Sequence, residues 1–388
     1  MTVPDTDSLM AGWRWWMRID FAKLQHQYHL YKAEIDAAIA RVLEHGRFIM
    51  GPEVAQLEKE LCAFTGAKEA VGCASGTDAL LLALMALGVG RGDEVITTPF
   101  TFIATAEAIA LLGATPVFAD IDETTYNIDP AKIEEKITDK TRGIISVSLY
   151  GQPSDLDAIS AIAKRHGLFH IVDGAQSFGA TYKGRAEVHH CDIYTTSFFP
   201  AKPLGCFGDG GAALTNDEEL AKKMQMLRIH GQDRRYHHRY IGLNARLDTI
   251  QAAVLLVKLS HYHKDLALRQ EVARKYTYTL PDFLIKPIIK PNRTSAWAQY
   301  SIRVKNRDEL QARLKEAGIP TAVHYPMPLH LQGCFNYLGY KKGDFVVAEK
   351  ISEEILSLPI NPYLSDEEIG HIVHKIKELA KNSNKRAV

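Results

Sequence analysis

The sequence has little cysteine, and none of it forms a recognisable pair. Five cysteines are spread over 388 residues, and no two stand in a CxxC motif. This odd, scattered set fits neither a disulfide framework nor a zinc site, and the histidines show no metal-ligand spacing either, so no metal is expected. We therefore expect a protein of a reducing compartment, the cytoplasm being the simplest one.

The sequence also lacks an excess of charge and a long apolar run. Lysine plus arginine and aspartate plus glutamate both number 46, so the formal net charge is zero. Proteins that bind nucleic acid usually carry a net basic surface, so this class of partner is not expected. No stretch reaches the roughly 18 consecutive apolar residues that would span a bilayer, so no membrane association is expected.

The first twenty residues lack the basic segment followed by an apolar segment that defines a secretory signal. They contain Trp13, Trp15 and Trp16 instead. We interpret residues 1–17 as an N-terminal extension or packed arm. An interfacial membrane anchor is the weaker alternative, because no apolar helix accompanies the tryptophans.

Short apolar runs alternate with amphipathic or apolar segments along most of the chain. Helices are expected over 34–44, 77–87, 104–112 and 156–166, and strands over 94–100, 116–120, 143–149, 168–172 and 193–199. This alternation predicts an α/β fold with a mostly parallel central sheet flanked by helices. The pattern changes after residue 265, so we expect a large domain over 18–265 and a smaller C-terminal α+β domain over 266–388.

Two polar features follow expected strands, where an α/β sheet collects its ligands. The run Ser75-Gly76-Thr77 opens an expected helix, whose N-terminal N–H groups favour a phosphate. An ordinary helix cap is the alternative. Asp173 ends an apolar strand in HIVDGAQ, and Gln176 follows it closely enough to face the same pocket. For this pair too, a helix cap and a solvent-facing amide are the alternative.

Two further features are a lysine and an aromatic ring. Lys202 stands among phenylalanines, prolines and a leucine in SFFPAKPLGCFG, and desolvation there would lower its pKa and favour a nucleophilic amine. The alternative is a surface lysine whose stem packs on apolar groups. Phe102 also follows an expected strand and could stack on a flat ring, although core packing is the usual fate of such a residue. A phosphate cup, a carboxylate, an aromatic face and a desolvated lysine together are what pyridoxal 5′-phosphate requires.

The same residues resemble a known family. Lys202 in SFFPAKPLG, Asp173 in VDGAQS, the SGTDAL turn and GLNARLDTIQAA are similar to the DegT/DnrJ/EryC1/StrS sugar aminotransferases. The resemblance implies an aspartate-aminotransferase-like fold type I enzyme that uses pyridoxal 5′-phosphate, with pyridoxamine 5′-phosphate as its intermediate form. It also implies a homodimer with shared active sites.

Carried over to this sequence, the resemblance assigns a role to each motif residue. Lys202 would bind the cofactor aldehyde and act as the catalytic base, and Asp173 would be the partner of the ring nitrogen. Gln176 would contact the ring face or its hydroxyl, and Phe102 would stack on it. The phosphate would be held by residues of the helix start, the lysine strand and the neighbouring subunit, namely Ser75, Gly76, Thr77, Ser197 and Asn244. Gly174 replaces an alanine common in the family and removes only a methyl group.

Within the family, two segments resemble the enzymes that aminate C3 of UDP-2-acetamido-2-deoxy-3-keto-glucuronic acid. These are HGQDRRYHHRY at 230–240 and PTAVHYPMPLH at 320–330. The likeness implies L-glutamate as amino donor, a UDP-linked keto sugar as acceptor, and a role in surface polysaccharide such as lipopolysaccharide O-antigen. Because that substrate carries a carboxylate and a diphosphate, its candidate contacts are Arg246, His324 and Tyr325, with the Arg234–Arg235 pair as a further candidate.

Three other functions remain open at this point. A different nucleotide-linked keto sugar is possible, because substrate specificity resides in loops. A related sugar dehydratase is disfavoured, because those enzymes have histidine where Lys202 stands. A non-catalytic regulatory or binding protein on the same fold is disfavoured by the intact set of Lys202, Asp173 and Ser197.

Overall fold

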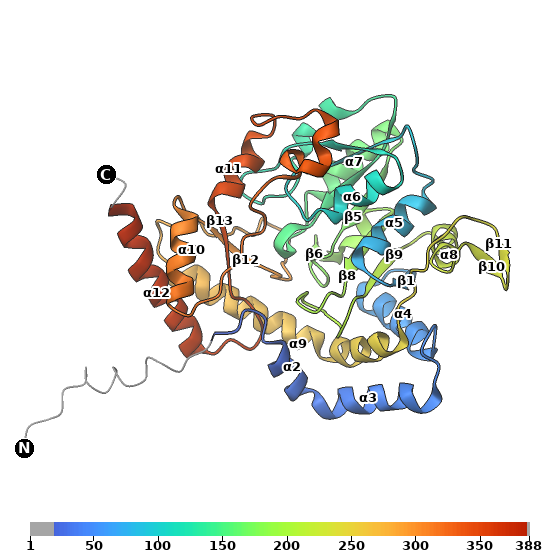
Figure 1. Cartoon of the computed structure of the whole chain (residues 1–388), viewed down its shortest axis with the longest axis horizontal. Coiled ribbons are helices and arrows are strands. Elements are labelled where there is room, and N and C mark those ends of the chain that lie inside the picture. Colours follow the sequence, from blue (N-terminus) through green and yellow to red (C-terminus); the bar gives the residue numbers. More distant parts are fainter. Residues whose placement is uncertain (1–18, 386–388) are drawn as a thin grey trace, which may run out of the picture.

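A computed structural model describes residues 19–385 (Figure 1). The expected extension over 1–17 therefore lies outside the described residues. At the centre of the fold is a seven-stranded sheet in the order β1-β9-β8-β5-β4-β2-β3. Its strands are β1 (Glu69–Cys73), β2 (Glu94–Thr97), β3 (Thr115–Phe118), β4 (Thr141–Val147), β5 (Phe169–Asp173), β8 (Ile193–Ser197) and β9 (Gly211–Thr215).

The sheet is mostly parallel, as the alternation of strands and helices predicts. The strands β3, β2, β4, β5 and β8 pair in parallel, whereas β9 runs antiparallel to both of its neighbours, β8 and β1. Strand β9 reverses because residues 198–210 connect it to β8 without a crossover helix, and a parallel pairing needs such a crossover. Lys202 lies in that connection.

Helices cover both faces of the sheet (Figure 1). The elements are α3 (Lys32–His45), α4 (Pro52–Thr65), α5 (Gly76–Ala86), α6 (Ala104–Leu111), α7 (Leu156–His166) and α8 (Glu218–Leu227), preceded by α2 (Leu24–Leu30). Helix α3 ends at Gly46, which takes a left-handed conformation at φ 67° as the expected C-cap. Helix α5 is so apolar that six of its residues are fully buried between the sheet and α8.

The C-terminal third forms a second layer, most of which shares one core, while Ala348 and Ile351 pack in a cluster with Phe100 and Phe118 of the first part. It contains α10 (Arg307–Glu316), α11 (Val346–Glu354), α12 (Asp366–Lys385) and the antiparallel pair β12 (Tyr300–Arg303) and β13 (Ile355–Leu358). The remaining pieces are short: β6 (Thr181–Tyr182), β7 (Arg185–Ala186), β10 (Gln232–Arg234), β11 (His237–His238) and the 3₁₀ turns η1 (Pro130–Lys132), η2 (Glu134–Lys136), η3 (Leu149–Gly151), η4 (Glu187–His190), η5 (Leu329–Leu331) and η6 (Gly333–Leu338).

One long helix joins the two parts. Helix α9 (Thr249–Thr279) packs Leu255 and Leu259 into the core below the sheet, and its last turns place Tyr276 in the core of the C-terminal third (Figure 1). Arg269, further along α9, donates hydrogen bonds to the carbonyl oxygens of Trp297 and Ile360. The boundary predicted after residue 265 thus falls inside α9, and the division into two domains stays a prediction.

Candidate active site

Ten of the residues predicted from the sequence line one cavity of about 470 Å³. They are Ser75, Gly76, Thr77, Phe102, Asp173, Gln176, Ser197, Lys202, His324 and Tyr325. Asp173 and Ser197 are the last residues of β5 and β8, and Gly76 begins the helix after β1. The cavity therefore lies at the carboxyl edge of the parallel strands, where open α/β sheets bind their ligands.

Lys202 projects into this cavity from the connection between β8 and β9. Its own N–H donates to the carbonyl oxygen of Phe199 across 2.9 Å, which closes a tight turn around it. Burial lowers the pKa of the Lys202 amine, and the negative charge of Asp173 opposes that shift in part. A lowered pKa raises the fraction of neutral amine, which is the form that acts as a nucleophile or base.

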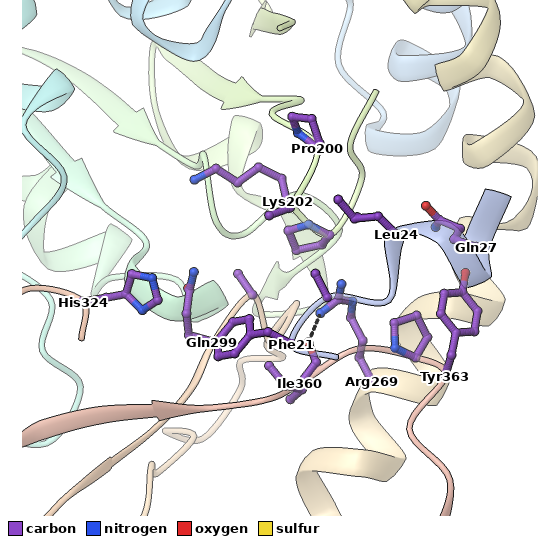
Figure 2. A pocket seen from close by; sticks show the side chains of 15 residues that line it. Phe21, Leu24, Gln27, Pro200, Lys202, Arg269, Gln299, His324, Ile360 and Tyr363 are labelled. Carbon is purple, nitrogen blue, oxygen red and sulfur yellow. Dashed lines mark hydrogen bonds between the residues drawn. The ribbon is translucent and has the colours of Figure 1, made fainter. Parts of the chain in front are cut away.

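A smaller cavity of about 80 Å³ lies beside the Lys202 stem (Figure 2). Phe21 and Leu24, near the start of the described chain, and Ile360 and Tyr363, from the C-terminal third, enclose it. Figure 2 shows the Lys202 side chain extending away from Leu24 and Tyr363. These groups therefore lie behind the lysine and shield its stem from solvent.

Asp173 is a buried carboxylate with two hydrogen-bond donors. The hydroxyl of Thr105 donates to Oδ2 across 2.7 Å, and the N–H of Ala175 donates to Oδ1 across 3.1 Å. Burial raises the pKa of Asp173, while the two donors and the charge of Lys202 lower it. A carboxylate in this setting gains most from a cation placed beside it, and a protonated ring nitrogen is such a cation.

The start of helix α5 meets the end of strand β8 at the opposite side of the cavity. The first N–H groups of a helix have no acceptor within it, so those of Gly76 and Thr77 are available to an anion. A Cβ on Gly76 would lie 2.7 Å from Cβ of Ser197, so only glycine allows this close approach. Ser75 is engaged as the helix cap, since its hydroxyl accepts from the N–H of Asp78 across 3.0 Å.

Aromatic and amide groups line the rest of the cavity. Gln176 is buried; its amide oxygen accepts from the N–H of Tyr150 across 2.6 Å, and its amide nitrogen donates to the hydroxyl of Tyr325 across 3.1 Å. Phe102 is 56% exposed, and its ring centroid lies 6.3 Å from that of Tyr325. Phe102 thus offers a free ring face to the cavity, as stacking on a flat ligand requires.

His324 lies at the wall that the C-terminal third contributes. Its Nδ1 is 2.9 Å from the hydroxyl of Ser357. Burial lowers the pKa of His324 to about 4, with a contribution from the positive charge of Lys202. The imidazole is therefore neutral near pH 7, and it contacts a substrate as a hydrogen-bonding group and not as a cation.

Asn244 and Arg246 do not reach this cavity within one chain. They line a separate hollow of about 380 Å³, and Asp209 lines both spaces. The pair Arg234–Arg235 lies at the exposed β10–β11 hairpin. The roles predicted for Asn244, Arg246 and the arginine pair therefore stay predictions.

The structure also adds residues that the sequence did not indicate. Thr105, Asp209 and Gln299 contact Asp173 or line the cavity. Thr105 stands three residues after Phe102, but no sequence motif assigned it a role of its own, and Gln299 is distant in sequence from every cavity motif. Asp209, in the glycine-rich run after Lys202, also stood near a recognisable signal.

The residues present fit pyridoxal 5′-phosphate. This cofactor needs an anion cradle, an acid for its ring nitrogen and a lysine amine for its aldehyde. The cavity offers the α5 terminus against Ser197, the buried carboxylate of Asp173 and the amine of Lys202. Within residues 19–385 there is no cluster of three side chains that could hold a metal, and no helix there is long and apolar enough to cross a bilayer.

Comparison with known proteins finds similarity over almost the whole chain. Residues 30–377 match the profile of the DegT/DnrJ/EryC1/StrS aminotransferase family. A UDP-2-acetamido-2-deoxy-3-oxo-D-glucuronate aminotransferase of Pseudomonas aeruginosa is 53% identical over 347 residues, covering 89% of this chain and 96% of the relative. A pleiotropic regulatory protein of Geobacillus stearothermophilus is 48% identical over 366 residues, covering 93% and 98%. The solved structure of S. venezuelae DesV in complex with a ketimine intermediate is similar at TM-score 0.91 and 41% identity, covering 94% of this chain and 99% of that chain.

Proposed function

Because the chain belongs to the DegT/DnrJ/EryC1/StrS aminotransferase family and is a pyridoxal-phosphate-dependent sugar aminotransferase, we propose the substrates on which it acts. The amino donor is L-glutamate, and the acceptor is C3 of UDP-2-acetamido-2-deoxy-3-keto-glucuronic acid. The product enters the biosynthesis of a surface polysaccharide such as lipopolysaccharide O-antigen, and the reaction takes place in the cytoplasm. The 53% identity to an enzyme named for this keto sugar supports the choice of acceptor.

One structural observation carries the chemistry: Lys202, Asp173 and the α5 terminus line the same cavity. Pyridoxal 5′-phosphate, when bound, withdraws electrons from the carbon that loses a proton. Among the residues that the structure describes, Lys202 is the only lysine lining that cavity. With its lowered pKa it takes the proton from Cα of the donor and later returns a proton to the sugar carbon.

The other residues bind and orient. The carboxylate of Asp173 holds a proton on the ring nitrogen, and Thr105 and Ala175 fix the orientation of that carboxylate. The N–H groups of Gly76 and Thr77 and the hydroxyl of Ser197 hold the phosphate, while Ser75 keeps the helix end in place as its cap. Phe102 stacks on the ring, and Gln176 contacts the edge of the ring, held in place by its bond to the hydroxyl of Tyr325.

The sugar approaches over His324 and Tyr325, which are the two predicted substrate contacts that line the cavity. A neutral imidazole and a phenol donate or accept hydrogen bonds from sugar hydroxyl and carboxylate oxygens. Arg246, which lines the neighbouring hollow, provides the positive charge for the acceptor's anionic groups.

A second copy of the chain completes the site. Asn244 does not line the cavity of its own chain, but Asp209 lines both that cavity and the hollow of Asn244. In a homodimer, Asn244 reaches the phosphate held by the other copy. The active enzyme is therefore a dimer with shared sites.

The test is an assay with defined sugars. Purified protein with pyridoxal 5′-phosphate is mixed with glutamate and a panel of UDP- and dTDP-linked keto sugars, and each product is identified by mass spectrometry. We expect the 3-keto uronate to be aminated with the highest kcat/KM and 2-oxoglutarate to form in equal amount. Faster amination of another keto sugar would replace the proposed acceptor with that sugar.

A regulatory role is the second candidate, because a relative of 48% identity is named as a pleiotropic regulatory protein. A binding protein has no need of a base, so glutamate would leave the yellow colour of its bound cofactor unchanged. An aminotransferase loses that colour when glutamate alone is added. Bleaching measured in the absence of any sugar therefore separates the two candidates.

A further inference from the structure

Lys258 is a second buried lysine, and it lies outside the cavity. It stands on α9 with 2% of its surface exposed, and burial lowers its pKa to about 8. Its Nζ donates to the carbonyl oxygen of Gly205 across 2.7 Å and lies 4.3 Å from the ring centroid of Phe207. Within the described chain no carboxylate pairs with Lys258, which is unusual because a buried charge is normally paired.

Both groups that Lys258 contacts belong to the segment that carries the reacting lysine. Residues 198–206 fold back on themselves, since the N–H of Cys206 donates to the carbonyl oxygen of Phe198 across 2.8 Å. A Cβ on Gly205 would lie 2.4 Å from the carbonyl oxygen of Pro200, so the two arms of this loop are in direct contact. Lys202 stands between Pro200 and Gly205 in this loop, so the position of Gly205 helps to set the position of Lys202.

A second residue of α9 contacts the same part of the loop, residues 205–207. Gln251 precedes Lys258 by seven residues, which places the two side chains on one face of the helix. Its amide oxygen accepts from the N–H of Phe207 across 2.8 Å. Between them, Leu255 packs in the core beneath the sheet, so this part of α9 is a fixed support.

We propose that Lys258 is a positioning residue for Lys202. Its ammonium group holds residues 205–207 of the loop by the bond to Gly205 and by the cation–π contact with Phe207. A charged donor suits this position because the glycine-rich segment has few side chains of its own, and only one other side chain of α9, Gln251, bonds to it within the described residues. The proposal rests on Lys202 being the reacting amine of the proposed function, but the order of the loop is measurable without any substrate or cofactor.

The first test is amide hydrogen exchange on the ligand-free protein. Lys258→Met removes the charge and the donor at similar length, and Lys258→Arg retains both. Lys264→Met is the matched control, because Lys264 is an exposed lysine on the same helix. We expect exchange at the amides of Lys202 and Cys206 to be at least about tenfold faster in Lys258→Met, which is the effect of losing one charged hydrogen bond.

The second test uses the protein with its cofactor. For Lys258→Met we expect kcat about tenfold lower with the KM for glutamate unchanged, together with weaker retention of the yellow cofactor. Lys258→Arg recovers most of both losses, and Lys264→Met behaves as the wild type. Unchanged loop exchange in Lys258→Met overturns the proposal, whether or not the wild type aminates the proposed sugar.

A second, milder variant keeps the test decisive if Lys258→Met disturbs the whole fold. Phe207 is 40% exposed, so Phe207→Leu removes the ring face without opening the core. If Lys258→Met raises exchange throughout the molecule, Phe207→Leu decides the question. Faster exchange confined to residues 199–208 supports the proposal, and exchange equal to wild type in that segment overturns it.

Discussion

The hydroxyl of Thr105 donates a hydrogen bond to Oδ2 of Asp173 across 2.7 Å, from the second residue of α6 to the last residue of β5. Asp173 is buried, and burial raises the pKa of its carboxyl group. The hydroxyl of Thr105 acts in the opposite direction and stabilises the ionised form. The negative charge that must face the ring nitrogen therefore depends on a neighbouring threonine.

Thr105→Val is expected to lower kcat by about tenfold, because one hydrogen bond to a charged group is lost while the shape of the side chain is kept. Thr105→Ser retains the hydroxyl and should keep most of the activity. Asp173→Asn, which removes the charge itself, should be more damaging than either. Steady-state kinetics on the three variants tests this order, and a Thr105→Val enzyme as active as Thr105→Ser would contradict it.

Lys202→Ala is expected to abolish both the yellow colour and turnover, because the same amine binds the cofactor aldehyde and moves the proton. The loss of rate should be on the order of 10³-fold or more. Absorbance spectra and single-turnover rates with glutamate measure the two effects. Lys264→Ala, at an exposed lysine, should leave both unchanged. A Lys202→Ala enzyme that transaminates at the wild-type rate would show that the base lies elsewhere.

Gly76→Ala is expected to weaken cofactor binding. The added Cβ would lie 2.7 Å from Cβ of Ser197 and would push the helix terminus away from the strand that completes the phosphate cradle. We expect the Kd for pyridoxal 5′-phosphate to rise by about tenfold or more, as overpacking typically costs 1–3 kcal/mol. Gly90→Ala is the control, since a Cβ there meets nothing within 4 Å. Equal affinities in a fluorescence titration would refute the role given to Gly76.

His170 is expected to make the protein less stable in mild acid. It is buried between the hydroxyls of Ser146 and Ser160, at 2.8 and 3.0 Å, and burial lowers its pKa from 6.5 to about 4. The unfolded chain therefore binds a proton before the folded one does. Stability is fully present above pH 6.5 and is lost as the pH falls toward 4, by roughly 3 kcal/mol in all.

Urea unfolding at pH 7 and pH 5 measures this loss. A His170→Gln variant should show a smaller difference between the two pH values than the wild type. Some difference remains, because His324 is also neutral and buried and its pKa is also about 4. His166→Gln removes only an exposed ion pair with Glu134 and should change the pH dependence little. An identical pH dependence in His170→Gln and wild type would rule out His170 as the source.

The local patterns predicted five strands of the central sheet and four of the helices around it, together with the polar groups that follow them. Helix α7 begins and ends at the predicted residues, 156 and 166, because an apolar stripe is followed by a glycine stop. Asp173 and Lys202 were recognised because a charged residue next to an apolar segment stands out in the amino-acid sequence alone. Because parallel sheets bind ligands at the carboxyl ends of their strands, this implied that Asp173 and Lys202 lie close together.

Relationships between distant segments were not accessible in the same way. Neither the hydrogen bond from Thr105 to Asp173 nor the position of Gln299 at the cavity could be predicted, because these contacts depend on how α6 and the C-terminal third pack. The sequence also did not predict strand β9 or its reversed direction, since a short apolar run has no direction until its connection to the sheet is known. Arg246 follows Asn244 closely in a recognisable motif, yet the fold places both outside the cavity of their own chain.

The uninterrupted run of α9 carries a consequence for how this chain can change in length. Each inserted or deleted residue turns everything beyond it by about 100° and shifts it by about 1.5 Å along the axis. An insertion or deletion between Lys258 and Arg269 would leave Lys258 bonded to Gly205. It would turn Arg269 away from the carbonyl oxygens of Trp297 and Ile360, which it now contacts. Length variation in related chains should therefore be found at turns such as the β10–β11 hairpin, and not within helix α9.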